Sequence, residues 1–268
     1  MTSDTSPSGS PRRVPEELLA AWRAEQTGQP EGWNFSSLTG RMDQDSPPWD
    51  FEQVCREAAG QASHVLDMGT GDGEALLRLA DVLPHDTVAT EGWAPNVPVA
   101  TAALAAHGIA VVEFGQPDDL DELEPMPFPT GRFDLILNRH ESYHPGEIAR
   151  VLAPGGTFLT QQVGGDELGE LLGHPAPAPQ VRFDLHRAAL SAAGLSVVDG
   201  AQFVGSYRFD DVAALVAYLQ LVPWEAPEDF TVDAYAEQLL ALHESGPASG
   251  PPVRLSLKRF WLRCRRPA

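Results

Sequence analysis

The stretch Val65-Leu66-Asp67-Met68-Gly69-Thr70-Gly71-Asp72-Gly73-Glu74, followed directly by Ala75-Leu76-Leu77, decides the fold of this chain. Its first residues are mostly apolar and predict a short buried strand over residues 65–68. Three glycines follow, and glycine is favoured where a backbone turns tightly and comes close to a ligand. The apolar residues after Glu74 then open a helix. Strand, glycine turn and helix together predict a nucleotide-binding crevice.

Short apolar stretches alternate with helical stretches along the chain from Ala62 onward. This alternation is typical of a mostly parallel sheet with helices on both faces. Gly108 and Gly194 support it, since each stands where a helix should end in a left-handed cap. The predicted strands cover residues 65–68, 87–90, 109–114, 133–138, 157–163, 195–201 and 253–264. We therefore expect an α/β fold with a Rossmann-like, seven-stranded, mostly parallel sheet.

The segments outside the sheet have patterns of their own. Leu18, Leu19 and Trp22 recur at helical spacing, and two helical stretches near residues 210–221 and 231–243 precede the last strand. The predicted organisation is a disordered tail (1–13), an N-terminal helical lid (14–61), a core that carries the glycine turn (62–206), a helical cap insertion (207–252), and the last core strand with the C-terminus (253–268).

Composition narrows the class of partner. The 268 residues include 18 Lys and Arg against 38 Asp and Glu, and the net charge of -20 repels polyanions. This charge argues against a nucleic-acid partner. No stretch approaches the roughly 18 apolar residues of a membrane span, and residues 1–13 lack the apolar core of a signal peptide. We therefore expect a cytoplasmic protein that does not contact membranes.

The two cysteines, Cys55 and Cys264, are too few for a four-thiolate zinc site and lie far apart in the sequence. We expect both to be buried as small apolar residues. The sequence contains no cluster of side chains with metal-ligand spacing, so we predict no metal site.

Acidic residues beside the glycines distinguish two classes of ligand. The dinucleotide fingerprint G-x-G-x-x-G requires glycine where Glu74 stands, and Asp72 adds a second carboxylate where a pyrophosphate would lie. S-adenosylmethionine (SAM) has no phosphate and carries a sulfonium cation, so it tolerates an acidic rim. Glu91 follows Gly73 by eighteen residues and ends the second predicted strand, where a carboxylate can accept hydrogen bonds from ribose hydroxyls. The alternative is a turn that only connects two elements, with Glu91 solvated.

These residues carry a family resemblance. Residues 65–73 resemble motif I of class I SAM-dependent methyltransferases, and Glu91 resembles the ribose-binding acid of that family. Residues 133–138 and 147–157 resemble its fourth strand and its following helix, turn and fifth strand, and the likeness covers residues 62–201. The resemblance implies SAM as cofactor. The cofactor-binding residues that it implies are Asp67, Gly69, Gly71, Gly73, Glu91, Gly92, Trp93, Gln116, Asn138 and Arg139.

The end of the fourth core strand delivers an unusually polar run, Asn138-Arg139-His140-Glu141-Ser142-Tyr143-His144. Alignment of donor and acceptor can supply about 7 to 11 kcal/mol towards methyl transfer, and a general base adds roughly 100-fold to 10,000-fold. We predict His140 as the catalytic base because histidine titrates near neutral pH, with Glu141 as its orienting partner or replacement. Alternatively, His140 and Arg139 bind loop carbonyls and Glu141 caps a helix.

The predicted acceptor is a small molecule, methylated on oxygen or nitrogen. The Asp/Asn-Pro-Pro-Tyr motif of many amino-group methyltransferases is absent, because Asn138 is followed by Arg139. We expect aromatic residues of the lid, core and cap to enclose the acceptor. These residues are Trp33, Phe35, Trp49, Tyr143, Tyr207, Tyr218 and Trp224.

Two other functions stay open at this point. Residues from Glu147 through the cap, including 219–224, are similar to ribosomal RNA guanine methyltransferases, which makes an RNA base a second candidate acceptor. Those enzymes carry an N-terminal four-cysteine zinc module that this chain lacks. The other alternative is a SAM-binding protein without catalysis, because donor binding and methyl transfer use different residues.

Overall fold

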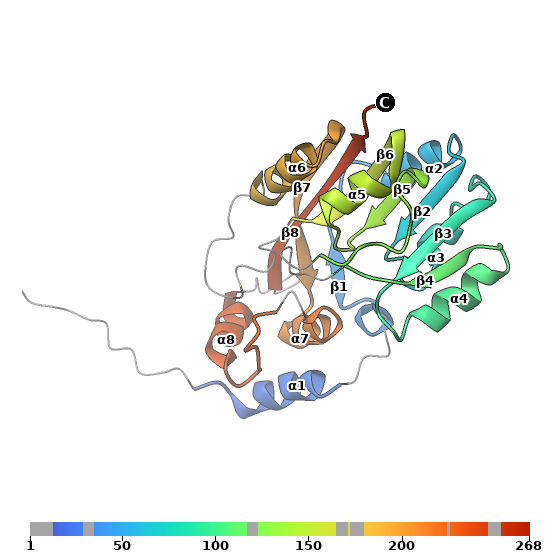
Figure 1. Cartoon of the computed structure of the whole chain (residues 1–268). Coiled ribbons are helices and arrows are strands. Elements are labelled where there is room, and N and C mark those ends of the chain that lie inside the picture. The colour runs from blue at the N-terminus through green and yellow to red at the C-terminus, as the bar shows by residue number, and fades with distance from the viewer. Residues whose placement is uncertain are drawn as a thin grey trace, which may run out of the picture. The chain divides into compact units, whose positions relative to one another are not determined.

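The computed structural model describes residues 13–28, 35–116, 123–164, 171, 180–223, 226–245 and 253–268. It divides the chain into two compact units (Figure 1). Among the described residues, the first unit comprises 13–28, 35–45, 171, 206–223, 226–245 and 253–257, and the second comprises 46–116, 123–164, 180–205 and 258–268. The glycine turn belongs to the second unit.

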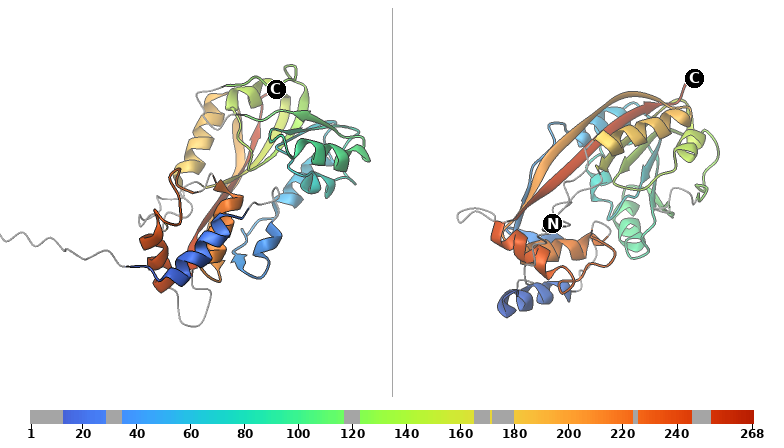
Figure 2. Two further views of the ribbon diagram at one scale, coloured as in Figure 1. Left: turned by 90° about the horizontal axis from the view of Figure 1, so that it is seen from below. Right: turned by 90° about the vertical axis from the view of Figure 1, so that its left-hand side faces the viewer.

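The sheet has the strand order β1-β7-β8-β6-β5-β2-β3-β4. Its strands are β1 (Met42–Gln44), β2 (His64–Met68), β3 (Asp86–Glu91), β4 (Ala110–Glu113), β5 (Phe133–Arg139), β6 (Leu152–Val163), β7 (Ser196–Phe209) and β8 (Val253–Arg265). The pairs β2–β3, β2–β5, β3–β4 and β5–β6 are parallel, whereas β8 runs antiparallel to β6. Figure 2 shows the long strands β7 and β8 side by side. The predicted α/β fold with a mostly parallel core is confirmed.

The predicted number of strands was wrong by one. The eighth strand, β1, pairs antiparallel with β7, with Met42 opposite Phe209 and Gln44 opposite Tyr207. Three residues are too few to show an alternating pattern, so this strand was not among those predicted from the sequence. The pairing is reinforced by Arg208, whose guanidinium binds the carboxylates of Asp43 at 2.7 Å and Asp45 at 2.5 Å.

Helices of the second unit cover both faces of its sheet, as the alternation predicted. They are α2 (Phe51–Ala59), α3 (Glu74–Leu77), α4 (Val97–Ala105), α5 (Pro145–Val151) and α6 (Gln180–Ala192). On one face, Ile148 of α5 and Leu190 of α6 pack against Ile136 and Phe158 of the sheet. On the other face, residues of α2 pack against the alternate residues of the same strands. This alternation places both faces of the parallel core out of water.

The first unit is built around a buried helix. Helix α7 (Val212–Leu221) is apolar almost all round and packs against α1 (Glu16–Gln26), the 3-10 helix at Phe35–Leu38 and α8 (Ala236–Ser245). The ring of Tyr218, on α7, packs against that of Tyr207 with centroids 5.4 Å apart and planes tilted by 48°. The predicted lid and cap segments thus contribute to one unit. No helix among the described residues is long and apolar enough to cross a membrane.

Helix α2 belongs to the other unit, although the sequence grouped it with the N-terminal lid. Its buried residues Phe51, Cys55 and Ala59 pack against Val65 of β2 and Leu135 of β5. Its N-cap is Asp50, whose side chain accepts a hydrogen bond from the Gln53 amide at 2.9 Å. The helix is therefore part of the wall beside the glycine turn.

Candidate functional site

The glycine turn joins β2 to α3. Gly69, Gly71 and Gly73 have φ values of +62°, +66° and +87°, in the left-handed region that favours glycine. A Cβ on Gly71 would meet no atom within 4 Å, so the turn is open there. A Cβ on Gly73 would lie 3.1 Å from Leu104, which assigns this glycine to packing between α3 and α4.

The carboxylate of Glu91 joins the two turns that follow β2 and β3. Its Oε2 accepts a hydrogen bond from the Gly71 amide at 2.7 Å, and its Oε1 accepts one from the Trp93 amide at 2.8 Å. Glu91 is only 6% exposed. An ionised carboxylate offers about four acceptor positions, so two remain for the hydroxyls of a bound ribose.

A flat apolar surface lies next to Glu91. The indole of Trp93 is 43% exposed, which is unusual for so large an aromatic side chain. The backbones of the turns after β3 and β4 touch, since a Cβ on Gly92 would lie 2.7 Å from the Cα of Gly115. Gln116 is buried and donates from its Nε2 to the carbonyl of Glu124 at 2.7 Å. The neighbouring residues 117–122 lie outside the described residues.

Sequence reasoning missed Asn96. It occupies the N-cap of α4, but its side chain makes no capping hydrogen bond. Its Nδ2 is buried and has no hydrogen-bond partner among the described residues. A buried donor without a partner costs about 1 to 3 kcal/mol, so its presence beside Glu91 and Trp93 indicates a ligand that accepts a hydrogen bond there. Adenosine carries such acceptors, and the residues present therefore fit SAM.

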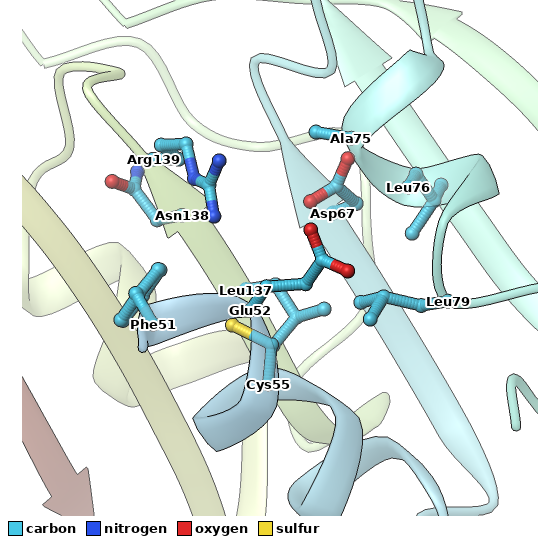
Figure 3. Close-up of a pocket in the computed structure, with 10 residues that line it drawn as sticks. All are labelled: Phe51, Glu52, Cys55, Asp67, Ala75, Leu76, Leu79, Leu137, Asn138 and Arg139. Carbon is cyan, nitrogen blue, oxygen red and sulfur yellow. The ribbon is translucent and has the colours of Figure 1, made fainter. Parts of the chain in front are cut away.

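A pocket lies next to the glycine turn and is shown in Figure 3. Its charged residues are Asp67, Arg139 and Glu52, and Glu52 pairs with Arg78 at 2.7 Å. Its other lining residues are Phe51, Cys55, Ala75, Leu76, Leu79, Leu137 and Asn138. Three of the ten come from α2, whose position relative to the strands the sequence did not predict.

Asp67 and Arg139 give this pocket opposite charges. Burial raises the pKa of Asp67 to about 6, while the nearby Thr70 side chain and the charge of Arg139 oppose the shift. The Arg139 guanidinium lies 5.6 Å from the centroid of the Phe51 ring. Within the described part of the chain it forms no ion pair. The pair suits a ligand end that carries both an ammonium group and a carboxylate.

A buried hydrogen-bond network fixes the end of β5. Asn138 Oδ1 accepts from Thr160 Oγ1 at 3.0 Å and from Gln162 Nε2 at 2.7 Å. Asn138 Nδ2 and Gln162 Nε2 also donate hydrogen bonds to the backbone carbonyl of Glu141, at 3.1 and 3.0 Å. Asn138 is 1% exposed, so its side chain holds the loop after β5 in place.

His140 has the only positive φ, +64°, of any non-glycine residue in the described ranges. Such a conformation costs free energy in a residue with a Cβ, and residues of this kind cluster at functional sites. The residue is exposed, and its amide donates to the Gln161 carbonyl at 2.9 Å. Surrounding protein atoms and the charges of Arg259 and Arg139 lower the pKa of His140. The imidazole is therefore neutral at pH 7, and the lowered pKa makes it a weaker base than an ordinary histidine.

Glu141 does not cap the following helix. The N-cap of α5 is His144, whose Nδ1 accepts a hydrogen bond from the Gly146 amide at 3.1 Å. The Glu141 side chain instead lies on the glycine turn, because a Cβ on Gly69 would be 2.6 Å from its Cβ and from its Oε2.

The aromatic residues that were expected to enclose an acceptor are divided between the two units. In the second unit, Trp49 Nε1 donates to Gln161 Oε1 at 3.0 Å, beside the end of β6. Tyr143 is 5% exposed and hydrogen-bonds through its hydroxyl to His186 Nδ1 at 2.6 Å, as a core residue does. Phe35, Tyr207 and Tyr218 belong to the first unit, and Trp33 and Trp224 lie outside the described residues.

Comparison with known proteins supports this description of the second unit. Residues 65–156 match a family model described as a methyltransferase domain. The chain is 30% identical over 118 residues to the uncharacterized methyltransferase YcgJ of Bacillus subtilis, covering 41% of this chain and 45% of that protein. It is 33% identical over 116 residues to a fatty-acid O-methyltransferase of Mycolicibacterium smegmatis, covering 41% of this chain and 40% of that protein. The chain spans less than half the length of these curated relatives.

Solved structures show the same fold. The crystal structure of YcgJ from Bacillus subtilis superimposes with a TM-score of 0.56 at 19% identity, covering 81% of this chain and 98% of that one. A putative methyltransferase from Bacillus halodurans gives a TM-score of 0.56 at 19% identity, covering 82% of this chain and 99% of that one.

Proposed function

We propose that this chain, whose residues 65–156 form a class I SAM-dependent methyltransferase domain, transfers the methyl group of SAM to a small-molecule acceptor. The observation that carries the proposal is the contact between Gly71 and Glu91. An open backbone position and a carboxylate with free acceptor capacity meet there, bridged by a 2.7 Å hydrogen bond. A turn that only connects two elements needs neither.

Three groups of residues around Gly71 and Glu91 are proposed to bind three parts of SAM: the ribose, the adenine and the amino-acid end. Glu91 takes the ribose, while Trp93, Asn96 and Gln116 surround the adenine. Asp67 and Arg139 bind the ammonium and carboxylate of the amino-acid end. When bound, SAM supplies a methyl group on a positively charged sulfur, which is already an activated leaving group.

The chain itself then has two tasks, to align the acceptor and to take its proton. The Asn138 network holds the loop after β5 against the donor turn, so the acceptor approaches along one direction. His140 stands on that loop with a neutral imidazole and serves as the base.

The proposed acceptor is small and mostly apolar. The net charge of -20 disfavours a polyanion. Two relatives bear names that refer to small organic molecules, the fatty-acid O-methyltransferase and a demethylmenaquinone methyltransferase of Thermus thermophilus, to which this chain is 33% identical over 103 residues. The latter match covers 35% of this chain and 44% of that protein.

A transfer assay tests the acceptor class. The protein is incubated with methyl-labelled SAM and, separately, with ribosomal RNA, total protein and a small-molecule extract of the source organism. Label is expected in the small-molecule fraction. Label at one position of unmodified ribosomal RNA, at an enzyme-like rate, would overturn the proposal in favour of an RNA base.

Glu91→Ala should weaken SAM binding by about 1 to 3 kcal/mol, through lost charge-assisted hydrogen bonds. Glu113→Ala is the matched control, because Glu113 is the exposed residue that pairs with Glu91 on the neighbouring strand β4. It should bind SAM as the wild type does. Equal affinities for Glu91→Ala and the wild type in a calorimetric titration would remove Glu91 from the donor site.

A further inference from the structure

The carboxylate of Glu141 lies in a cradle of glycines. A Cβ on Gly69 would be 2.6 Å from Glu141 Oε2, and a Cβ on Gly115 would be 3.4 Å from Glu141 Oε1. A side chain on Gly69 would displace the carboxylate, whereas a Cβ on Gly115 would lie in van der Waals contact with it. Gly69 therefore makes room for an acidic group directly above the turn that is proposed to hold the donor.

This position is fixed by the surrounding structure. The carbonyl of Glu141 accepts hydrogen bonds from Asn138 Nδ2 and Gln162 Nε2, and both donors are buried. Two residues further on, Tyr143 is anchored in the core by its bond to His186. The backbone on both sides of Glu141 is thus tied to the sheet, and its side chain is held over Gly69.

Besides the exposed Asp72 and Glu74, two less exposed carboxylates lie near the turn, and their surroundings differ from those of Glu141. Glu91 is engaged by the amides of Gly71 and Trp93. Asp67 lies in the pocket of Figure 3, where the charge of Arg139 acts on it. Glu141 is the acidic group that approaches the turn from the β5 side, the side on which methyl transfer is proposed to occur.

We propose that Glu141 makes the protein hold SAM more tightly than its demethylated product, S-adenosylhomocysteine. This inference rests on the proposed function. The sulfur of SAM is positively charged, whereas the sulfur of the product is neutral, and the two molecules otherwise share their binding groups. A carboxylate fixed beside the sulfur attracts the first and not the second. Such a preference would favour exchange of product for fresh donor after each transfer.

The test compares the affinities of wild type, Glu141→Gln and Glu74→Gln for both ligands by calorimetry. Glutamine keeps the shape of Glu141 in its glycine cradle and removes the charge. Glu74 is an exposed carboxylate at the start of α3, so its substitution controls for a change in net charge near the turn. Glu141→Gln should bind SAM about tenfold more weakly and bind the product within about twofold of wild type, the scale of one partly screened charge pair. Glu74→Gln should change neither affinity.

Glu141→Ala distinguishes this role from that of a plug that must leave before the donor enters. A plug predicts that Glu141→Ala binds both SAM and the product more tightly, whereas Glu141→Gln, which keeps the shape of the plug, binds both as the wild type does. That result would overturn the proposal. Equal changes for the two ligands in Glu141→Gln would overturn it as well. If the wild type binds neither ligand, the proposed function itself fails. Circular dichroism of each variant confirms that the fold is retained.

Discussion

Gly71→Val should abolish SAM binding and leave the protein folded. No atom lies within 4 Å of the position that a Cβ on Gly71 would take, and the amide of this residue donates to Glu91. A branched side chain would fill the space in which the donor must lie. Calorimetry of the variant should give no heat of binding at SAM concentrations that saturate the wild type.

Gly155→Val is the matched control for this variant. Gly155 has φ +78° and also has no atom within 4 Å of a Cβ, but it lies near the amino end of β6, whereas the glycine turn follows the carboxyl end of β2. A side chain in the left-handed region costs about 1 to 2 kcal/mol, so both variants should lose similar thermal stability. Only Gly71→Val should lose SAM binding. Wild-type affinity in that variant would contradict the donor site.

His140→Ala should lower turnover by roughly 100-fold to 10,000-fold, the contribution of a general base, and should leave SAM affinity close to that of the wild type. The reason is its place on the loop after β5, which is proposed to face the transferred methyl group and not the adenosine. Steady-state kinetics with saturating SAM and direct titration of SAM measure the two effects separately. A defect in binding alone would remove His140 from catalysis.

His140→Asn distinguishes a role of the imidazole as a base from a role of the left-handed backbone conformation at this position. Asparagine adopts the left-handed conformation more readily than most residues but cannot act as a base near pH 7. If His140 is the base, the alanine and asparagine variants lose turnover equally. Recovery of turnover in His140→Asn would show that the residue acts through the conformation of the loop.

The pH dependence of turnover offers a further check on His140. Its pKa is lowered from the ordinary value of 6.5 by the surrounding protein atoms and by Arg259 and Arg139. A base with a lowered pKa stays unprotonated as the pH falls through 6.5 and is lost only at lower pH. Turnover should therefore not fall at that point through titration of His140. A decline with a midpoint at 6.5, absent from His140→Asn, would show an imidazole of ordinary pKa.

The core strands could be predicted because each is a short apolar stretch between turn residues. The ends of the strands were harder to predict from the sequence. The last residues of β7 alternate, with buried Tyr207 and Phe209 on either side of Arg208, but the prediction placed them in the cap insertion. The residues of β1 have no apolar pattern at all, because the strand is held by pairing with β7 and by Arg208.

The candidate site was predictable where function depends on backbone shape. Positive φ values at Gly69 and Gly71 follow from the glycines themselves, and the position of Glu91 follows from the parallel register of β2 and β3. Side-chain directions were not. Asn96 resembles an ordinary helix cap in the sequence, and Glu141 was grouped with His140 because the two are adjacent. The buried network of Asn138 and Gln162 turns the Glu141 side chain towards Gly69, and no sequence pattern indicates that network.

The measurement that tests the central claim most directly is a calorimetric titration of the purified wild-type protein with SAM, with S-adenosylhomocysteine and with NAD, all in the presence of a metal chelator. We predict saturable binding of SAM and of S-adenosylhomocysteine, each at one molecule per chain, and no binding of NAD, because the carboxylates of Asp72 and Glu74 beside the glycine turn repel a pyrophosphate, which SAM lacks. Binding of NAD without binding of SAM would contradict it.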